Sequence, residues 1–140
     1  MSMMSFSLIG ASELPTAAAA FEAEILQQAS RLAPWQERKV ARHIREHLDQ
    51  PISVHDLAGL VGLSASYFSR RFRGSFGVAP RAYVIRSRLE RAQSLMRQSR
   101  TPLCAIALDC GFCDQAHMSR LFHTVIGSTP SRWRRQQALA

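Results

Sequence analysis

The side chains best suited to binding a ligand lie on one side of a helix predicted after Ser64. Four outward residues and two at the edges make up that side: Ser66, Tyr67, Arg70, Gly74, Ser69 and Arg73. Phosphates bind cations, and guanine edges bind a bidentate guanidinium, so such a face suits the DNA major groove. An ordinary amphipathic surface helix would show the same pattern, and for one helix taken alone that interpretation is favoured.

The neighbouring residues predict how this side is positioned. Phe68, Phe72 and Phe76 follow one another at steps of four, so they lie together on the opposite side and must be buried. Upstream, a short apolar helix ends at Gly62, and Ser64 is a good N-cap for the next helix. Two short helices joined by a glycine turn predict a helix-turn-helix, with a positive φ expected at the glycine.

A related stretch recurs further along the chain. Ala58 and Gly62 recur 49 residues later as Ala107 and Gly111. Five more residues recur 50 positions later, in the order Ser69, Arg70, Phe72, Gly77 and Pro80 against Ser119, Arg120, Phe122, Gly127 and Pro130. Two copies are too few for a solenoid, so the repeat predicts a pair of similar subdomains.

The residues of both copies resemble the DNA-binding domain of AraC/XylS-type transcriptional regulators. In the first copy the resemblance rests on Gly62-Leu63-Ser64, Tyr67-Phe68-Ser69-Arg70 and Phe76-Gly77-x-x-Pro80. In the second it rests on Ile106-Ala107-x-x-Cys110-Gly111-Phe112-x-Asp114-Gln115-x-His117, Arg120-x-Phe122 and Gly127-x-Thr129-Pro130-x-x-Trp133-Arg134. The resemblance covers residues 34–137. It implies an all-α fold of about seven helices, in which a long central helix joins two helix-turn-helix subdomains.

The resemblance also implies a role for individual residues. By position in the motif, the base-reading residues are Ser66, Ser69, Arg70, Gln115, Ala116, His117 and Arg120. Expected phosphate contacts are Ser64, Arg73, Arg81 and Arg132. Ser66 and Ala116 are shorter than side chains that read bases well, so the first helix would depend on Arg70.

The implied function is sequence-specific regulation of transcription, with two recognition helices in adjacent major grooves of a promoter. The expected partners are double-stranded DNA and RNA polymerase, and a single chain carries both helices, so we expect a monomer on DNA. The alternative is an interaction module that does not bind DNA and antagonises a related regulator or contacts RNA polymerase.

Charge divides the chain at Pro34. Residues 1–33 have one Arg against three Glu, whereas residues 34–140 have 17 Lys plus Arg against seven Asp plus Glu, a net charge of +10. A domain this basic attracts polyanions. We interpret 1–33 as a tail or vestigial linker, disordered at its start, and 34–140 as the DNA-binding domain. Within it we expect a first unit at 34–78, a linker helix at 80–98 and a second unit at 101–137.

Periodicity predicts the helices inside these units. A first helix is expected from Pro34 to Asp49, burying Trp35, Val40, Ile44 and Leu48. The linker helix is expected from Pro80 to about Gln98, with Arg88 among the arginines around its apolar face. Thr101 and Pro102 should open the second unit as N-cap and first-turn proline. The second recognition helix is expected from about Cys113 to Val125, and Arg132, Arg134 and Arg135 should be exposed on a closing helix.

Other functions find little support in the residues. Cys110-x-x-Cys113 with His117 could suggest a zinc or redox site, but neither a four-ligand set nor a thioredoxin-like context is nearby. We expect Cys110 to be a buried thiol and predict no metal, no cofactor and no catalytic residues. The three cysteines and the lack of a signal peptide or membrane span predict a cytoplasmic protein.

Overall fold

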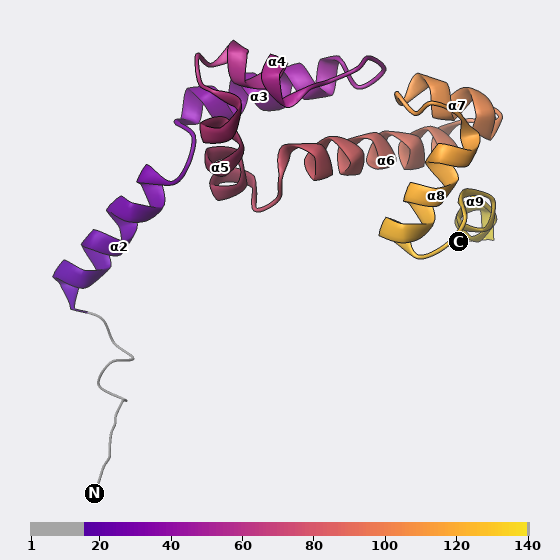
Figure 1. Cartoon of the computed structure of the whole chain (residues 1–140). Helices are drawn as coiled ribbons and strands as arrows, with labels where there is room; N and C mark the ends of the chain where they lie inside the picture. Colours follow the sequence, from indigo (N-terminus) through magenta and orange to yellow (C-terminus); the bar gives the residue numbers. More distant parts are fainter. Residues whose placement is uncertain (1–15, 140) are drawn as a thin grey trace, which may run out of the picture.

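The computed structural model describes residues 16–139 (Figure 1). Over that range the chain forms eight helices and no strand, which confirms the all-α class. The helices are α2 (Ala17–Ala29), α3 (Pro34–Glu46), α4 (Val54–Leu60), α5 (Ala65–Phe76), α6 (Pro80–Gln98), α7 (Leu103–Asp109), α8 (Gln115–Ile126) and α9 (Pro130–Leu139). The expected disorder at the start of the chain concerns residues outside the described range.

The first unit consists of α3, α4, α5 and the start of α6. Its core includes Val40, Ile44, Leu57, Phe68 and Phe72, all nearly inaccessible to solvent. Phe68 and Phe72 are buried as the steps of four predict, whereas Phe76 in the last turn of α5 is only partly buried. The Phe76 ring stacks on that of Phe72, and the Tyr83 ring of α6 meets Phe72 edge-on. Burial of these large side chains supplies the main stabilisation of the unit.

The second unit repeats this arrangement with α7, α8, α9 and the rest of α6. Its core includes Leu89, Ile106, Met118 and Phe122, again almost fully buried. Trp133 of α9 packs against the core, with its ring edge-on to that of Phe122 at 5.8 Å between centroids. The predicted pair of similar subdomains is therefore present.

The long helix α6 joins the units, and Figure 1 shows α5 and α8 at its opposite ends. It runs from Pro80 to Gln98, as predicted, and its 19 residues make it about 28 Å long. The two hydrophobic cores are separate: Val84 is the last α6 residue of the first, and the second includes buried Leu89 and the partly buried Ile85. The helix α6 thus contributes to a separate hydrophobic core at each of its ends.

Several predicted helix ends are wrong by a few residues. The first helix ends at Glu46 because the His47 amide turns back to the Ile44 carbonyl. In the second unit α7 has Pro102 itself as N-cap, without a side-chain cap. The helix expected from Cys113 begins at Gln115, because the Asp114 carboxylate accepts the His117 amide at 2.7 Å and caps it.

Two residues expected in the core are exposed. Trp35 is 51% exposed, since it lies about 140° around α3 from Val40 and so faces away from the buried stripe. Val125 is also 51% exposed, because it lies in the last turn of α8, where its neighbour Ile126 packs against the core instead. Conversely, Leu32, which precedes α3, is buried in the first core.

Candidate nucleic-acid interface

The outward side of α5 carries the polar residues that the sequence places there. The Ser64 hydroxyl accepts the Tyr67 amide at 3.3 Å, so α5 begins where the serine predicts. Ser66, Arg70 and Arg73 are exposed, whereas Ser69 is half-buried at the edge of the core. A row of hydroxyl and guanidinium groups therefore faces solvent along α5.

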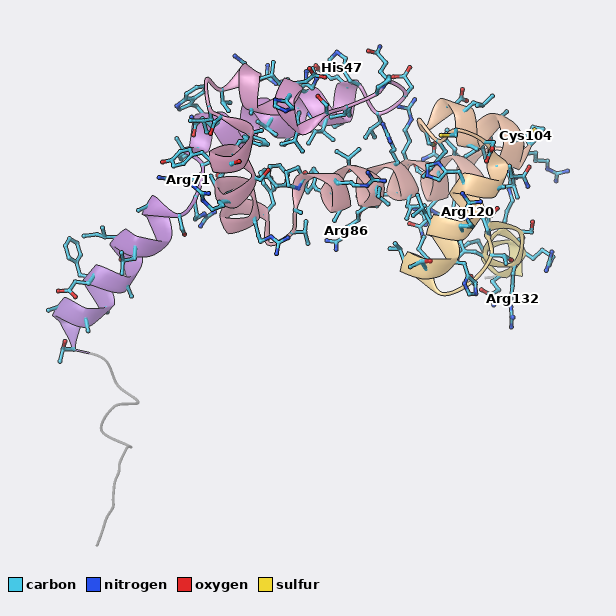
Figure 2. The ribbon with its side chains drawn as sticks, in the orientation of Figure 1. His47, Arg71, Arg86, Cys104, Arg120 and Arg132 are labelled. Carbon is cyan, nitrogen blue, oxygen red and sulfur yellow. The ribbon has the colours of Figure 1, made fainter. Side chains whose placement is uncertain are left out.

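The outward side of α8 is built in the same way. Gln115, Ala116 and Arg120 are exposed, and Arg120 is labelled in Figure 2. His117 is half-buried, and its Nδ1 accepts the Cys113 amide at 3.3 Å. That bond requires an unprotonated Nδ1, so neutral His117 carries its proton on Nε2 and presents an N–H donor. Such a donor suits guanine, thymine or phosphate oxygens.

The arginines of this surface are not engaged with carboxylates. Within residues 16–139 the structure has one ion pair, Arg31 with Glu37 at 3.3 Å. Arg70, Arg73, Arg81, Arg120 and Arg132 are exposed, and Arg132 is labelled on α9 in Figure 2. Their guanidinium groups remain available for an external anion such as phosphate.

Other predicted surface residues prove to be structural. Arg134, expected to be exposed, is half-buried and donates to the carbonyls of Thr101 at 2.8 Å and Ser99 at 2.7 Å. These bonds fix α9 to the turn after α6. Arg88, expected on the solvated face of α6, is also half-buried, and it donates to the carbonyls of Leu48 and Gln50. Burial lowers the pKa of the Arg88 guanidinium.

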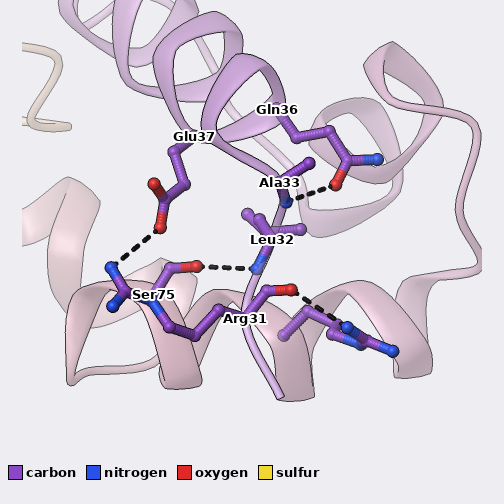
Figure 3. Close-up of polar contacts among 7 residues, drawn as sticks. Arg31, Leu32, Ala33, Gln36, Glu37 and Ser75 are labelled. Atoms are coloured by element: carbon purple, nitrogen blue, oxygen red, sulfur yellow. Dashed lines mark hydrogen bonds and ion pairs between the residues drawn. The ribbon is translucent and has the colours of Figure 1, made fainter. Parts of the chain in front are cut away.

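The chain before α3 docks on α5, which the sequence did not reveal. Figure 3 shows the Leu32 amide donating to the Ser75 hydroxyl at 2.7 Å and the Arg31 carbonyl accepting from a guanidinium. That guanidinium belongs to Arg71, at 3.0 Å, and Arg71 also donates to the Tyr67 hydroxyl. Arg71 therefore holds this segment on α5.

Gly74 permits the same docking. The sequence places it on the outward side of α5, but a Cβ there would lie 2.0 Å from the carbonyl oxygen of Ser30. The Ser30–Leu32 segment thus covers the C-terminal part of α5, and the face open to a ligand is confined to its first turns and to Arg73.

We expect Gly74→Ala to displace the Ser30–Leu32 segment. Loss of the Leu32 contacts should outweigh the better helix propensity of alanine and lower the free energy of unfolding by about 1–2 kcal/mol. Thermal unfolding measures this effect, and tryptic cleavage after Arg31 should become faster. Gly59→Ala in α4 is the control, because nothing lies within 4 Å of its Cβ position. Equal tryptic cleavage of both variants would contradict the docking.

The cysteines do not gather into a metal site. Across residues 16–139 there is no group of three or more His, Cys, Asp and Glu residues that could hold a metal ion. Cys110 is buried, as predicted, and burial raises the pKa of its thiol to about 11, so it stays protonated at neutral pH. Cys113 is exposed. In the same range, every helix is too short or too polar to cross a membrane.

The sequence of this chain is similar to those of several known regulatory proteins. A family model described as a helix-turn-helix domain matches residues 57–136. The probable transcriptional regulator LumQ of Photobacterium leiognathi is 34% identical over 94 residues, which cover 67% of this chain and 38% of that protein. The arabinose operon regulatory protein of Escherichia coli K12 is 31% identical over 98 residues, covering 69% and 34%. The chain thus spans about a third of the length of the curated relatives it matches.

Solved structures share the fold. The DNA-binding domain of AdpA, solved in complex with a target DNA, has a TM-score of 0.68 and 31% identity. The match covers 71% of this chain and 89% of that one. A transcriptional regulator from Chromobacterium violaceum, described as containing an AraC-type DNA-binding domain, also has a TM-score of 0.68, at 29% identity. That match covers 74% of this chain and 92% of the Chromobacterium violaceum chain.

Proposed function

This chain belongs to the AraC/XylS family of transcriptional regulators, and we propose that it binds promoter DNA with α5 and α8 in successive major grooves. One observation carries the proposal. The exposed sides of α5 and α8 both carry arginines without carboxylate partners, and the two helices lie at opposite ends of α6. A connecting helix of about 28 Å approaches the roughly 34 Å between successive major grooves on one face of DNA.

The exposed groups form two sets, one that would contact bases and one that would bind phosphates. In the first groove the base contacts would come from Ser66, Ser69 and Arg70, and in the second from Gln115, Ala116, His117 and Arg120. Phosphates would be bound by Ser64, Arg73, Arg81 and Arg132, which lie at or near helix ends. Arginine binds guanine in a bidentate manner, so Arg70 and Arg120 would contribute most to sequence preference.

The proposed assembly is one chain on an asymmetric site within the bacterial cytoplasm, with RNA polymerase as the further partner. Both recognition helices are on one chain, so a two-fold partner is unnecessary. The net charge of +10 over residues 34–140 would make affinity fall steeply with salt. Since the family regulates transcription, no catalytic role is proposed.

A duplex selected by the wild-type chain from a random-sequence library tests the proposal. We expect Arg70→Ala and Arg120→Ala each to weaken binding to that duplex by about 1–3 kcal/mol and to relax preference at one or two base pairs. Fluorescence anisotropy against selected and random duplexes measures both effects. Arg132→Ala is the control and should weaken both duplexes alike. Failure of the library to yield any enriched duplex at low salt would favour the interaction module instead.

A further inference from the structure

The two units touch directly at a joint formed by Arg88, Gly111 and the Leu48 carbonyl. Arg88 Nε donates to Leu48 O at 3.0 Å, and its Nη2 donates to Gln50 O at 2.8 Å. Gly111 of the second unit lies against the same carbonyl, since a Cβ there would be only 1.9 Å from Leu48 O and 2.8 Å from Arg88 Nε. Three elements from different parts of the chain therefore meet at one carbonyl oxygen.

Each member of this joint is anchored by a buried neighbour. The Leu48 side chain belongs to the first core, so its carbonyl moves with the first unit. Gly111 lies between Cys110 and Phe112, which are both buried in the second core. Arg88 lies on α6 between Val84, which is buried in the first core, and Leu89, which is buried in the second. The joint thus couples the bodies of the two units, not flexible surface groups.

Little else holds the units at a fixed angle. Beside the joint runs an open groove of about 750 Å³, which separates the loop after α3 from the second unit. Apolar residues from both units line it, including Ile52, Val54, Leu108 and Phe112. The main helix contacts lie within each unit or involve α6. A long helix can still bend, and the joint is a second connection between the units beside α6, so it limits how far they can tilt relative to each other.

We infer that Arg88 and Gly111 act as a spacer that fixes the relative orientation of α5 and α8 and so determines which half-element spacing the protein accepts. Arg88 is a positioning residue, because it contacts backbone carbonyls of the first unit and lies outside the proposed DNA-binding set. The inference rests on the proposed function. Each base pair added between half-elements rotates the second by about 35° and moves it about 3.4 Å, so a rigid reader discriminates single base pairs.

The test measures binding of the selected duplex and of variants with one or two base pairs added or removed between its half-elements. Wild type should show a sharp optimum, with affinity at least about 10-fold lower one base pair away. Arg88→Ala should bind the optimal duplex less tightly while losing most of that discrimination, and its affinity for a single half-element should be unchanged. The control is Arg86→Ala, an exposed arginine on the same helix that should lower all affinities equally (Figure 2).

The outcomes separate the inference from the proposed function. If no duplex is enriched, the proposed function fails. If wild type binds but tolerates every spacing equally, or if Arg88→Ala discriminates as sharply as wild type, the spacer inference fails and the proposed function stands. Should Arg88→Ala not fold, as judged by circular dichroism, Arg88→Gln replaces it, because glutamine can keep one of the two carbonyl bonds. It should then show intermediate discrimination.

Discussion

Gly111→Ala should lower the free energy of unfolding by about 3 kcal/mol or more, whereas Gly62→Ala should lower it by about 1 kcal/mol. Both glycines have the positive φ that the sequence predicts, +71° at Gly62 and +88° at Gly111. They differ in their surroundings, because nothing lies within 4 Å of a Cβ at Gly62. At Gly111 a Cβ would collide with a backbone oxygen, which cannot rotate away as a side chain would.

Urea unfolding followed by circular dichroism measures both variants, and the comparison isolates the contact with Leu48 from the backbone strain that the two positions share. Gly111→Ala should also weaken binding to the complete DNA site, and not only the contact with the second half-element. The reason is that the added methyl group pushes the two units apart. Equal losses of stability for the two variants would mean that the units separate freely and that the contact contributes nothing.

Inserting five base pairs between the half-elements should reduce affinity at least about 100-fold. Five base pairs rotate the second half-element by about half a turn, to the face of the duplex opposite α8. Ten inserted base pairs restore the face but lengthen the distance between the half-elements from about 34 Å to about 68 Å, more than twice the length of the 19-residue α6, so binding should not recover.

Mobility-shift titrations with a matched duplex that carries the insertion outside both half-elements provide the control. Sedimentation analysis should give one chain per duplex. Recovery of affinity at ten base pairs, or a palindrome that requires two chains, would contradict a single rigid reader with two recognition helices.

The sequence predicted the features that depend on local patterns. The burial of Phe68 and Phe72 on α5 follows from phenylalanines at steps of four, and the N-cap of α5 follows from Ser64. The bounds of α6 follow from Pro80 and the apolar spacing. Each of these depends on residues within one or two helical turns, and such interactions are readable from residue type.

The contacts that position the candidate site were harder to predict. Arg88, Arg134 and Arg71 all donate to backbone carbonyls between 33 and 40 residues away. Every residue has a backbone carbonyl, so the type of the accepting residue gives no indication that it binds an arginine. A weak indication existed for Arg88, which lies about 60° from Ile85 and about 40° from Ala92 around α6, at the margin of the apolar face.

The separate cores of the two units have a consequence for how this protein can change over generations. Phe72 and Phe122 belong to different hydrophobic cores. A substitution beside one and a substitution beside the other should therefore change the free energy of unfolding additively. Each half can therefore acquire new base preferences without disturbing the other. The exception is the contact between the Leu48 carbonyl of the first unit and Gly111 of the second. Inherited changes in either unit must preserve this close approach.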